Sequence, residues 1–269
     1  IANQPVPACW TVAESEDNPD WQAAELVASS LDLEHHQHIL DPDTFHSRLP
    51  DLAWHGEDLD VTVLFFQPLF AKMAESVTVG LCGQGADELH AGYPRYRDLQ
   101  MHSDVVNERL KDLNCDLTNL QGEQWWSENH SPDSHTSSLQ DFLQFELDHG
   151  QLSNFQLRLV DRHSMAHGLE VRVPFLGSKH RDASNKLPME WRLPSSFDEK
   201  AALRSAAELT SLPSEIVRRP KLPAGRATSP KMIDSLLDEL NPYVEKIAKR
   251  HPELEQALIK QPEIAIGIG

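Results

Sequence analysis

The chain has 269 residues, of which 39% are hydrophobic and 25% charged, and its 24 basic and 42 acidic side chains give a formal net charge of −18. That length is enough for one large domain or two modest ones with a buried core. The acidic surplus repels phosphate backbones and argues against a nucleic-acid partner. No apolar run approaches the roughly 18 to 20 residues that cross a bilayer, so we expect no membrane partner.

Cysteine usage and the first residues bear on the compartment. Cys9, Cys82 and Cys115 lie far apart and show no Cys-x-x-Cys spacing, which argues against a disulfide framework or a cysteine-rich zinc module. The start of the chain does not resemble a secretory signal, so we expect a cytoplasmic protein. The first residue is Ile1 rather than Met, which suggests a processed product or the ordered part of something longer.

The first hundred residues alternate between strand and helix patterns. Strands are predicted at three places, over residues 8–13, 34–40 and 76–82. Two helices are predicted between the strands. The first covers 21–31, with Asn18 or Asp20 as its N-cap, and the second covers 60–76 despite Pro68. Strands separated by helices predict an α/β fold with a parallel sheet and flanking helices.

From about residue 99 the pattern changes. The stretch 104–149 is polar and predicts an exposed loop, above all over 125–138. Helices are expected around 139–149, 152–169, 198–209 and 230–259, and no further strand is expected. The sequence therefore divides into an α/β part, residues 1–98, and a mostly helical part, residues 99–269.

The segment from Leu81 to Tyr96 carries the clearest chemical signal. A strand ends there in a glycine-rich turn, Gly83-Gln84-Gly85, and a helix is predicted to begin with Asp87-Glu88. Glycines allow close approach of the backbone to a bound group, and free N–H donors at a helix start attract phosphate. The two acids add the oxygen ligands that Mg²⁺ requires. Alternatively, they only complement the helix dipole.

Two further segments concentrate charge. Residues 159–176 place Asp161, Arg162, Glu170 and Arg172 among apolar residues, so these charges are expected near or within a core, either functional or as an internal salt-bridge network. Residues 197–226 form a cationic island, which suits an anionic ligand such as phosphate, or else a solvated basic face; its charges are Lys200, Arg204, Arg218, Arg219, Lys221 and Arg226. Prolines on both sides of Lys221 favour a loop.

Other candidate sites carry weaker signals. On a strand, His36 and His38 would share a face and permit a two-His metal site, but no matching carboxylate or cysteine pattern follows, so surface histidines are favoured. Cys82 lies beside glycines, yet no sequence rule places a histidine base next to it.

With these segments in hand, the chain resembles the synthetase domain of glutamine-dependent asparagine synthetases. Residues 81–96 are similar to the family's Leu-Ser-Gly-Glu-Gly-Ala-Asp-Glu-Leu-Phe-Gly-Gly-Tyr, and residues 161–176 match its central motif nearly throughout. The segments Lys200 to Arg204, Leu212-Pro213 and Arg219 to Lys221 follow in the family's order. The resemblance weakens over 99–138 and after 230.

The resemblance implies an adenine nucleotide alpha hydrolase-like fold and ATP-dependent amide formation, in which aspartate is adenylated, pyrophosphate leaves and ammonia from a glutaminase attacks. It implies ATP and Mg²⁺ as cofactors, with residues 1–98 as an incomplete nucleotide-binding part, and a homodimer is possible.

By position, Asp87 would bind Mg²⁺, and Lys200 and Lys221 would face the phosphates. Cys82, Gly83, Gln84 and Gly85 would line the nucleotide and intermediate site, with Gln84 beside the reacting centre, and the adenine strand would include Trp10, Val12 and Ala13. Glu170 matches a carboxylate that handles protons in related lactam-forming synthetases.

The departures from the family pattern limit these expectations. The family's Ser-Gly-Gly-x-Asp-Ser pyrophosphate loop and its glutaminase domain are expected upstream of Ile1, so the chain alone should be inactive. Gln84 replaces a Glu, Cys82 replaces a Ser, and Gly177 replaces an Asp, while His90 and Ala91 replace Phe and Gly. Two alternatives therefore stay open, namely a secondary-metabolite amide or lactam synthetase and a degenerate subunit that only binds.

Overall fold

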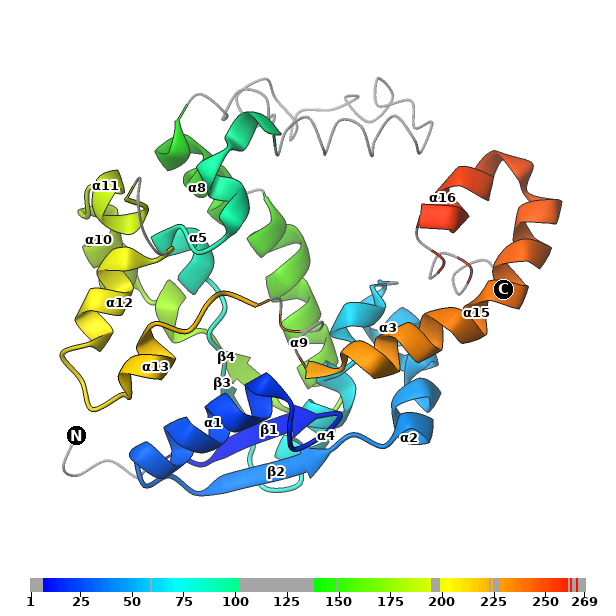
Figure 1. Cartoon of the computed structure of the whole chain (residues 1–269), viewed down its shortest axis with the longest axis horizontal. Coiled ribbons are helices and arrows are strands. Elements are labelled where there is room, and N and C mark those ends of the chain that lie inside the picture. The colour runs from blue at the N-terminus through cyan, green and yellow to red at the C-terminus, as the bar shows by residue number, and fades with distance from the viewer. Residues whose placement is uncertain are drawn as a thin grey trace.

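The computed structural model describes residues 7–58, 60–101, 138–148, 150–194, 199–222 and 228–260, together with 224, 262 and 265. Its described part contains two small parallel sheets and many helices (Figure 1). The mixed α/β class predicted from the sequence is confirmed at this level. The division at residue 98 stays a prediction.

The first sheet is a strand–helix–strand unit. Strands β1 (Cys9–Ala13) and β2 (His35–Ile39) pair in parallel, and α1 (Pro19–Ser30) connects them. The side chain of Asn18 caps α1 by accepting hydrogen bonds from the backbone N–H groups of Asp20 and Trp21. All three elements agree with the predicted ones within a few residues.

The second sheet joins residues that are far apart in the sequence. Strand β3 (Val79–Leu81) pairs in parallel with β4 (Glu170–Arg172), and Val79 lies opposite Glu170. The expectation of no strand after residue 99 is therefore wrong. Two of the three residues of β4 are charged, so its sequence lacks the apolar run that marks a buried strand.

The charges of β4 also lie elsewhere than expected. Alternate residues of a strand point to opposite faces, and here Val171 packs against the core while Glu170 and Arg172 face outward. Their side chains are 59% and 62% exposed and form an ion pair. Asp161 is exposed as well and Arg162 is half-buried, so none of the four charges expected near or within a core lies inside it.

The two sheets are linked by short helices. These are α2 (Pro42–Ser47), α3 (Leu49–Gly56), a 3₁₀ turn at Val61–Val63 and α4 (Phe66–Ala74). The single helix predicted over 60–76 is thus two elements, because Asp60 caps a separate 3₁₀ turn at Thr62. Pro68 lies in the first turn of α4, where a proline removes no intrahelical hydrogen bond.

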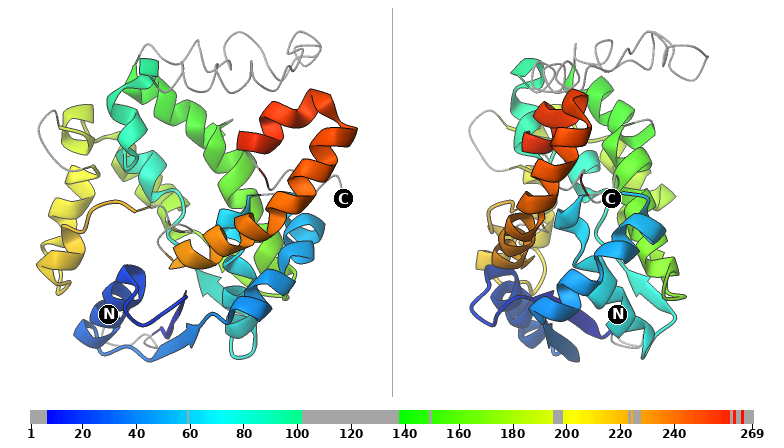
Figure 2. Two further views of the ribbon diagram at one scale, coloured as in Figure 1. Left: turned by 45° about the vertical axis from the view of Figure 1, so that its right-hand side comes forward. Right: turned by 90° about the vertical axis from the view of Figure 1, so that its right-hand side faces the viewer.

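The rest of the described chain is mostly helical, as predicted. Its helices are α8 (Leu139–Asp148), α9 (Leu157–Met165) after a π-helical segment at Leu152–Gln156, α10 (Ser178–Asn185), α11 (Met189–Arg192), α12 (Ala201–Ala207), α13 (Ser214–Val217), α15 (Pro230–Arg250) and α16 (Glu255–Lys260). Helices α10 to α13 lie on one side of the molecule, and α15 and α16 lie on the other (Figures 1 and 2). Of the loop predicted over 104–149, residues 104–137 and 149 fall outside the described residues, and 139–148 form α8, where a helix was also expected.

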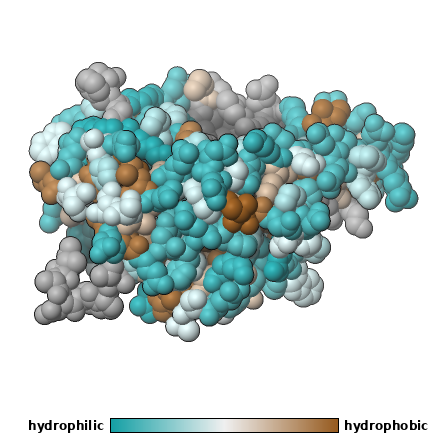
Figure 3. All heavy atoms as spheres, turned by 60° about the horizontal axis from the view of Figure 1, so that its bottom comes forward, coloured by the Kyte–Doolittle hydropathy of each residue, from teal (hydrophilic) through white to brown (hydrophobic). Residues whose placement is uncertain are grey.

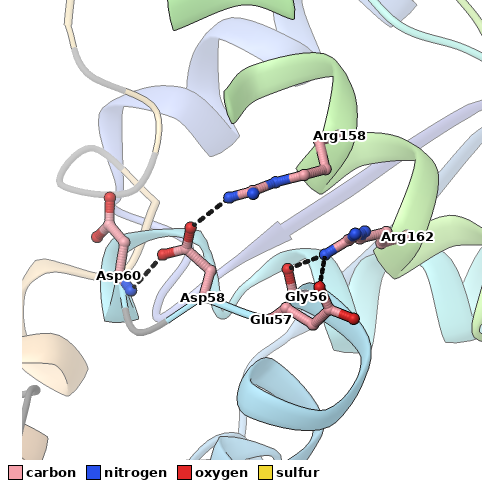
Figure 4. Close-up of polar contacts among 6 residues, drawn as sticks. All are labelled: Gly56, Glu57, Asp58, Asp60, Arg158 and Arg162. Atoms are coloured by element: carbon pink, nitrogen blue, oxygen red, sulfur yellow. Dashed lines mark hydrogen bonds and ion pairs between the residues drawn. The ribbon is translucent and has the colours of Figure 1, made fainter. Parts of the chain in front are cut away.

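Helix α9 is fastened to the end of α3 by two arginines (Figure 4). Arg158 pairs with Asp58 at 3.1 Å, and Arg162 donates to the carbonyl of Gly56 at 3.2 Å and to Glu57 at 2.7 Å. Since β4 follows α9 after a short turn, these contacts help to set β4 beside β3.

Helix α15 completes the core of the first sheet. Met232, Ile233 and Leu236 pack in one buried cluster with Val12 and Leu40. The backbone N–H groups of Lys231 and Met232 donate to Glu14 Oε2 at 2.8 and 3.2 Å, which satisfies donors at the start of this helix. The face shown in Figure 3 is mainly hydrophilic with scattered apolar spots. No helix in the described ranges is long and apolar enough to span a membrane.

Candidate active site

Three side chains from distant parts of the sequence meet at Asp87. Its carboxylate lies 3.0 Å from Lys200 Nζ through Oδ1 and 3.2 Å from Lys221 Nζ through Oδ2. All three side chains are largely buried, with exposed fractions of 15%, 19% and 24%. At such low exposure ion pairs are only weakly screened, so the cluster is a defined electrostatic centre. The structure thus brings together three of the site residues that the family resemblance implies, and their roles stay predictions.

The glycine-rich turn positions Asp87. The backbone N–H of Cys82 donates to the Arg172 carbonyl at 2.9 Å, which extends the β3–β4 pairing to the start of the turn. Gly85 then adopts a φ of 89°, which non-glycine residues rarely adopt, and α5 (Ala86–His90) begins. Asp87 thus lies in the first turn of a short helix.

The end of α5 brings the chain back against the same carboxylate. Ala91 has a φ of 54°, and the next N–H, that of Gly92, donates to the Asp87 carbonyl at 2.8 Å. A Cβ on Gly92 would lie 1.9 Å from Asp87 Oδ1. Residues 91 and 92 thus shape the site, although the sequence analysis assigned them no role; the two small residues after α5 were the available signal.

Lys200 and Lys221 are held by their own local structure. Lys200 has a φ of 58° and forms the N-cap of α12, a left-handed conformation that costs energy for a side chain with a Cβ. The buried Arg204 donates to the carbonyls of Glu199 and Val217, which ties the start of α12 to the end of α13. Lys221 follows α13 in a segment without helix or strand, as predicted.

The other described arginines of the predicted cationic island have partners other than Asp87. Arg218 pairs with Glu208, and Arg219 pairs with Asp20 of α1. Arg226 lies outside the described residues. The island is therefore divided among several partners rather than forming one solvated basic face.

A group of buried acids lies behind the site. Glu88 is fully buried, and neither of its carboxylate oxygens has a hydrogen-bond partner among the described atoms. Burial, together with the nearby Asp87 and Glu146, raises the pKa of Glu88 to about 7. Arg95 lies 3.4 Å from the buried Glu146, whose pKa burial also raises. Glu88 therefore carries a proton for much of the time near neutral pH.

The predicted adenine strand faces a cavity. A cavity of about 520 Å³ lies between β1 and α1, and its lining includes Trp10 and Val12. Ala13 is fully buried and does not line it. A second cavity of about 350 Å³ is lined by Lys200 and Lys221. Arg219 and Ile216 line both cavities, so the two spaces adjoin.

The other predicted site residues do not belong to the described ion-pair cluster at Asp87. Glu170 lies opposite Val79, four positions before Gly83, and its described partner is Arg172. Gly83 is exposed and Gln84 is half-buried. Burial raises the pKa of the Cys82 thiol, which disfavours the thiolate that a nucleophile needs. The ring of His36 stacks on Trp10 at 4.7 Å.

The residues at Asp87 fit a magnesium ion held partly by substrate. Asp87 Oδ1 is buried and accepts no well-aligned hydrogen bond, since Lys200 lies close but poorly oriented. Among the described residues, no group of three or more His, Cys, Asp or Glu side chains could hold a metal alone. Mg²⁺ commonly binds through one or two carboxylates plus phosphates and water, so a single carboxylate such as Asp87 is sufficient.

Comparison with known proteins identifies the family. The family model for asparagine synthase matches residues 2–265, which is nearly the whole chain. The chain belongs to the asparagine synthase family. The resemblance drawn from the three sequence motifs is thereby confirmed.

Relatives in the asparagine synthase family are diverged from this chain. It is 27% identical over 255 residues to the glutamine-hydrolyzing asparagine synthetase of Gallus gallus, covering 88% of this chain and 38% of that protein. The corresponding enzymes of Cricetulus griseus and Homo sapiens are 28% and 27% identical over 214 residues, covering 77% of this chain and 32% of each. The chain thus spans about a third of the length of these relatives.

Proposed function

We propose that this chain forms the synthetase part of an ATP-dependent amide ligase of the asparagine synthetase type, with an adenine nucleotide alpha hydrolase-like fold. The proposed substrates are ATP, aspartate and ammonia released by a glutaminase domain or chain. The observation that carries the proposal is the convergence of Lys200 and Lys221 on Asp87.

The reaction has two steps. In the first, an aspartate carboxylate oxygen attacks the α-phosphorus of ATP, the bond from that phosphorus to the bridging oxygen breaks, and pyrophosphate leaves. In the second, ammonia attacks the acyl carbon, AMP leaves, and the new amide loses a proton. Both the pyrophosphate and the AMP leaving groups gain negative charge, which fixed cations stabilise.

The proposed roles follow from the positions of the side chains. Lys200 and Lys221 bind the β- and γ-phosphates and stabilise the leaving pyrophosphate. Asp87 would hold Mg²⁺, which supplies Lewis-acid stabilisation of the phosphate oxygens when bound. The cavity along Trp10 and Val12 offers space for adenine beside β1.

The glycine-rich turn would bind the acyl-adenylate formed in the first step, and Glu170 would act in the second step. Gly83 and Gly85 allow the close approach of this intermediate beside Cys82, and Gln84 lies next to the reacting centre. Glu170 accepts the amine proton in this proposal. Its exposed position on β4, paired with Arg172, leaves its carboxylate accessible to solvent and substrate.

The test measures the products formed by the protein that the complete gene encodes. With ATP, Mg²⁺, aspartate and ammonium, we expect asparagine, AMP and pyrophosphate in equal amounts. Pyrophosphate release with another carboxylate, and none with aspartate, would instead support an amide or lactam synthetase. An absence of all ATP-dependent chemistry would support the non-catalytic alternative.

A further inference from the structure

Two cations lie over the aromatic ring of Tyr93. The distance to the ring centroid is 4.1 Å from Arg95 Cζ and 5.2 Å from Lys221 Nζ. Both are within the roughly 6 Å over which the face of an aromatic ring attracts a cation. The roles proposed above make no use of Tyr93.

The ring of Tyr93 is held in place from two directions. Gln156, in the π-helical segment before α9, donates to the Tyr93 hydroxyl at 2.8 Å. The ring of Tyr96 packs edge-on at a centroid distance of 5.6 Å. Burial raises the pKa of Tyr93, so its hydroxyl stays protonated and the ring uncharged at neutral pH. Tyr93 is therefore a fixed and neutral surface.

Lys221, by contrast, has a long and flexible side chain. It follows Pro220 in a segment without helix or strand, so its backbone gives limited control over the position of the ammonium. Its described contacts are the Asp87 carboxylate at 3.2 Å and the Tyr93 ring. Asp87 is also shared with Lys200, and any bound divalent cation would compete for the same oxygens. The ring is the contact that such competition does not remove.

We propose that Tyr93 is a positioning residue that holds the Lys221 ammonium beside Asp87, in the orientation in which it meets a diphosphate group. The diphosphate rests on the proposed function, whereas the contact between ring and ammonium does not. A ring orients an ammonium without neutralising its charge. A second carboxylate in the same place would compete with phosphate oxygens for its protons.

The first test examines the ligand-free protein by NMR with ¹³Cε-labelled lysine. Because Lys221 lies over a ring face, its ε-methylene protons should be shifted upfield, and Lys221→Arg identifies the signal by its loss. The shift should persist in Tyr93→Phe, which keeps the ring, and disappear in Tyr93→Leu. An unshifted Lys221 signal in the natural protein would overturn the proposal. If Tyr93→Leu fails to fold, the Lys221 signal of the natural protein and of Tyr93→Phe still tests the proposal, because both should show the upfield shift.

The second test measures binding of inorganic pyrophosphate without metal, by calorimetry. Tyr93→Leu should weaken binding about tenfold, equivalent to about 1.4 kcal/mol, while Tyr93→Phe stays within about twofold. The same Tyr93→Leu change should have no further effect in a Lys221→Ala background.

The outcomes of the second test separate the two proposals. An equal loss from Tyr93→Leu with and without Lys221 would mean that Tyr93 acts through the fold, and the positioning role would be wrong. Unchanged pyrophosphate binding in Lys221→Ala would contradict the phosphate role of Lys221 in the proposed function. In that event the lysine NMR signal still decides whether Tyr93 places the ammonium.

Discussion

Asp87 and Lys221 are 134 positions apart in the sequence, yet Lys221 Nζ lies 3.2 Å from Asp87 Oδ2. Lys200 approaches the other oxygen of the same carboxylate. One negative charge therefore faces two positive charges in a largely buried place. The excess of positive charge favours an anionic ligand, and phosphate oxygens match the ammonium donors.

Lys221→Ala should lower ATP–pyrophosphate exchange by about 10² or more, as for the loss of one preorganised charge at the transition state. Exchange of labelled pyrophosphate into ATP measures the effect in the full-length protein. Lys186→Ala is the matched control, because Lys186 is exposed and lies outside the site. Near-normal exchange in Lys221→Ala would remove this residue from the proposed mechanism.

Asp87→Asn keeps the shape of the side chain and removes its charge. The Mg²⁺ concentration for half-maximal exchange should rise about tenfold or more, which corresponds to about 1.4 kcal/mol of lost binding. Without metal, pyrophosphate should bind more tightly than in the natural protein, because the two lysines lose their carboxylate. Asp43→Asn, an exposed position, serves as control. An unchanged Mg²⁺ titration would exclude Asp87 as a ligand.

Gly92→Ala should disturb the site through sterics alone. The added Cβ would lie 1.9 Å from Asp87 Oδ1 and 2.9 Å from Asp87 Cα, so the side chain must move and the backbone must give way. We expect a loss of about 1–3 kcal/mol in unfolding free energy, typical of overpacking, and a weakened response to Mg²⁺. Denaturant unfolding measures the first effect. Gly83→Ala is the stability control, since a Cβ there meets no atom within 4 Å; equal stability of the two variants would contradict the prediction.

His163 should make the fold sensitive to acid. It is fully buried against Gln67, and burial, aided by the nearby His55, lowers its pKa from 6.5 to about 4. Between these values the unfolded chain takes up a proton at His163 and the folded chain does not. The unfolding free energy therefore falls as the pH drops through this window, by at most about 3 kcal/mol from this residue.

The measurement for His163 compares unfolding curves at pH 7, 5.5 and 4.5. His163→Gln should lose less stability on acidification than the natural protein, although buried His90, whose pKa is also lowered to about 4, keeps part of the effect. Gln37→Ala, on an exposed side chain that carries no titratable group, should leave the slope unchanged. Parallel pH profiles for His163→Gln and the natural protein would show that His163 does not titrate as described.

Much of the fold follows from local patterns. Helix α1 has an Asn18 cap and a proline in its first turn, and β1 is a short apolar run, so both can be predicted from the sequence. Strand β4 is not, because it is stabilised by pairing with β3 rather than by its own propensity. Short helices such as α11 and α13 have four residues each and show too little periodicity to recognise.

The site residues that could be predicted from the sequence are charged residues that lie within the family motifs. Lys200 and Lys221 stood out because cations are rare in this acidic chain, Asp87 stood out because it follows the glycine-rich turn, and the family motifs include all three. Gly92 and Tyr93 did not, because their importance is geometric: one leaves room for a carboxylate, and the other offers a ring face. Such roles depend on the left-handed backbone at Ala91, which local sequence did not reveal.

The bond network around Glu14 makes the first strand dependent on a helix that follows more than two hundred residues later. Loss of α15 would remove Met232 and Ile233 from the cluster around Val12. It would also leave the Glu14 carboxylate without the backbone N–H donors of Lys231 and Met232. Damage at α15 would therefore disturb β1, and during synthesis this strand cannot acquire its final packing until α15 has left the ribosome.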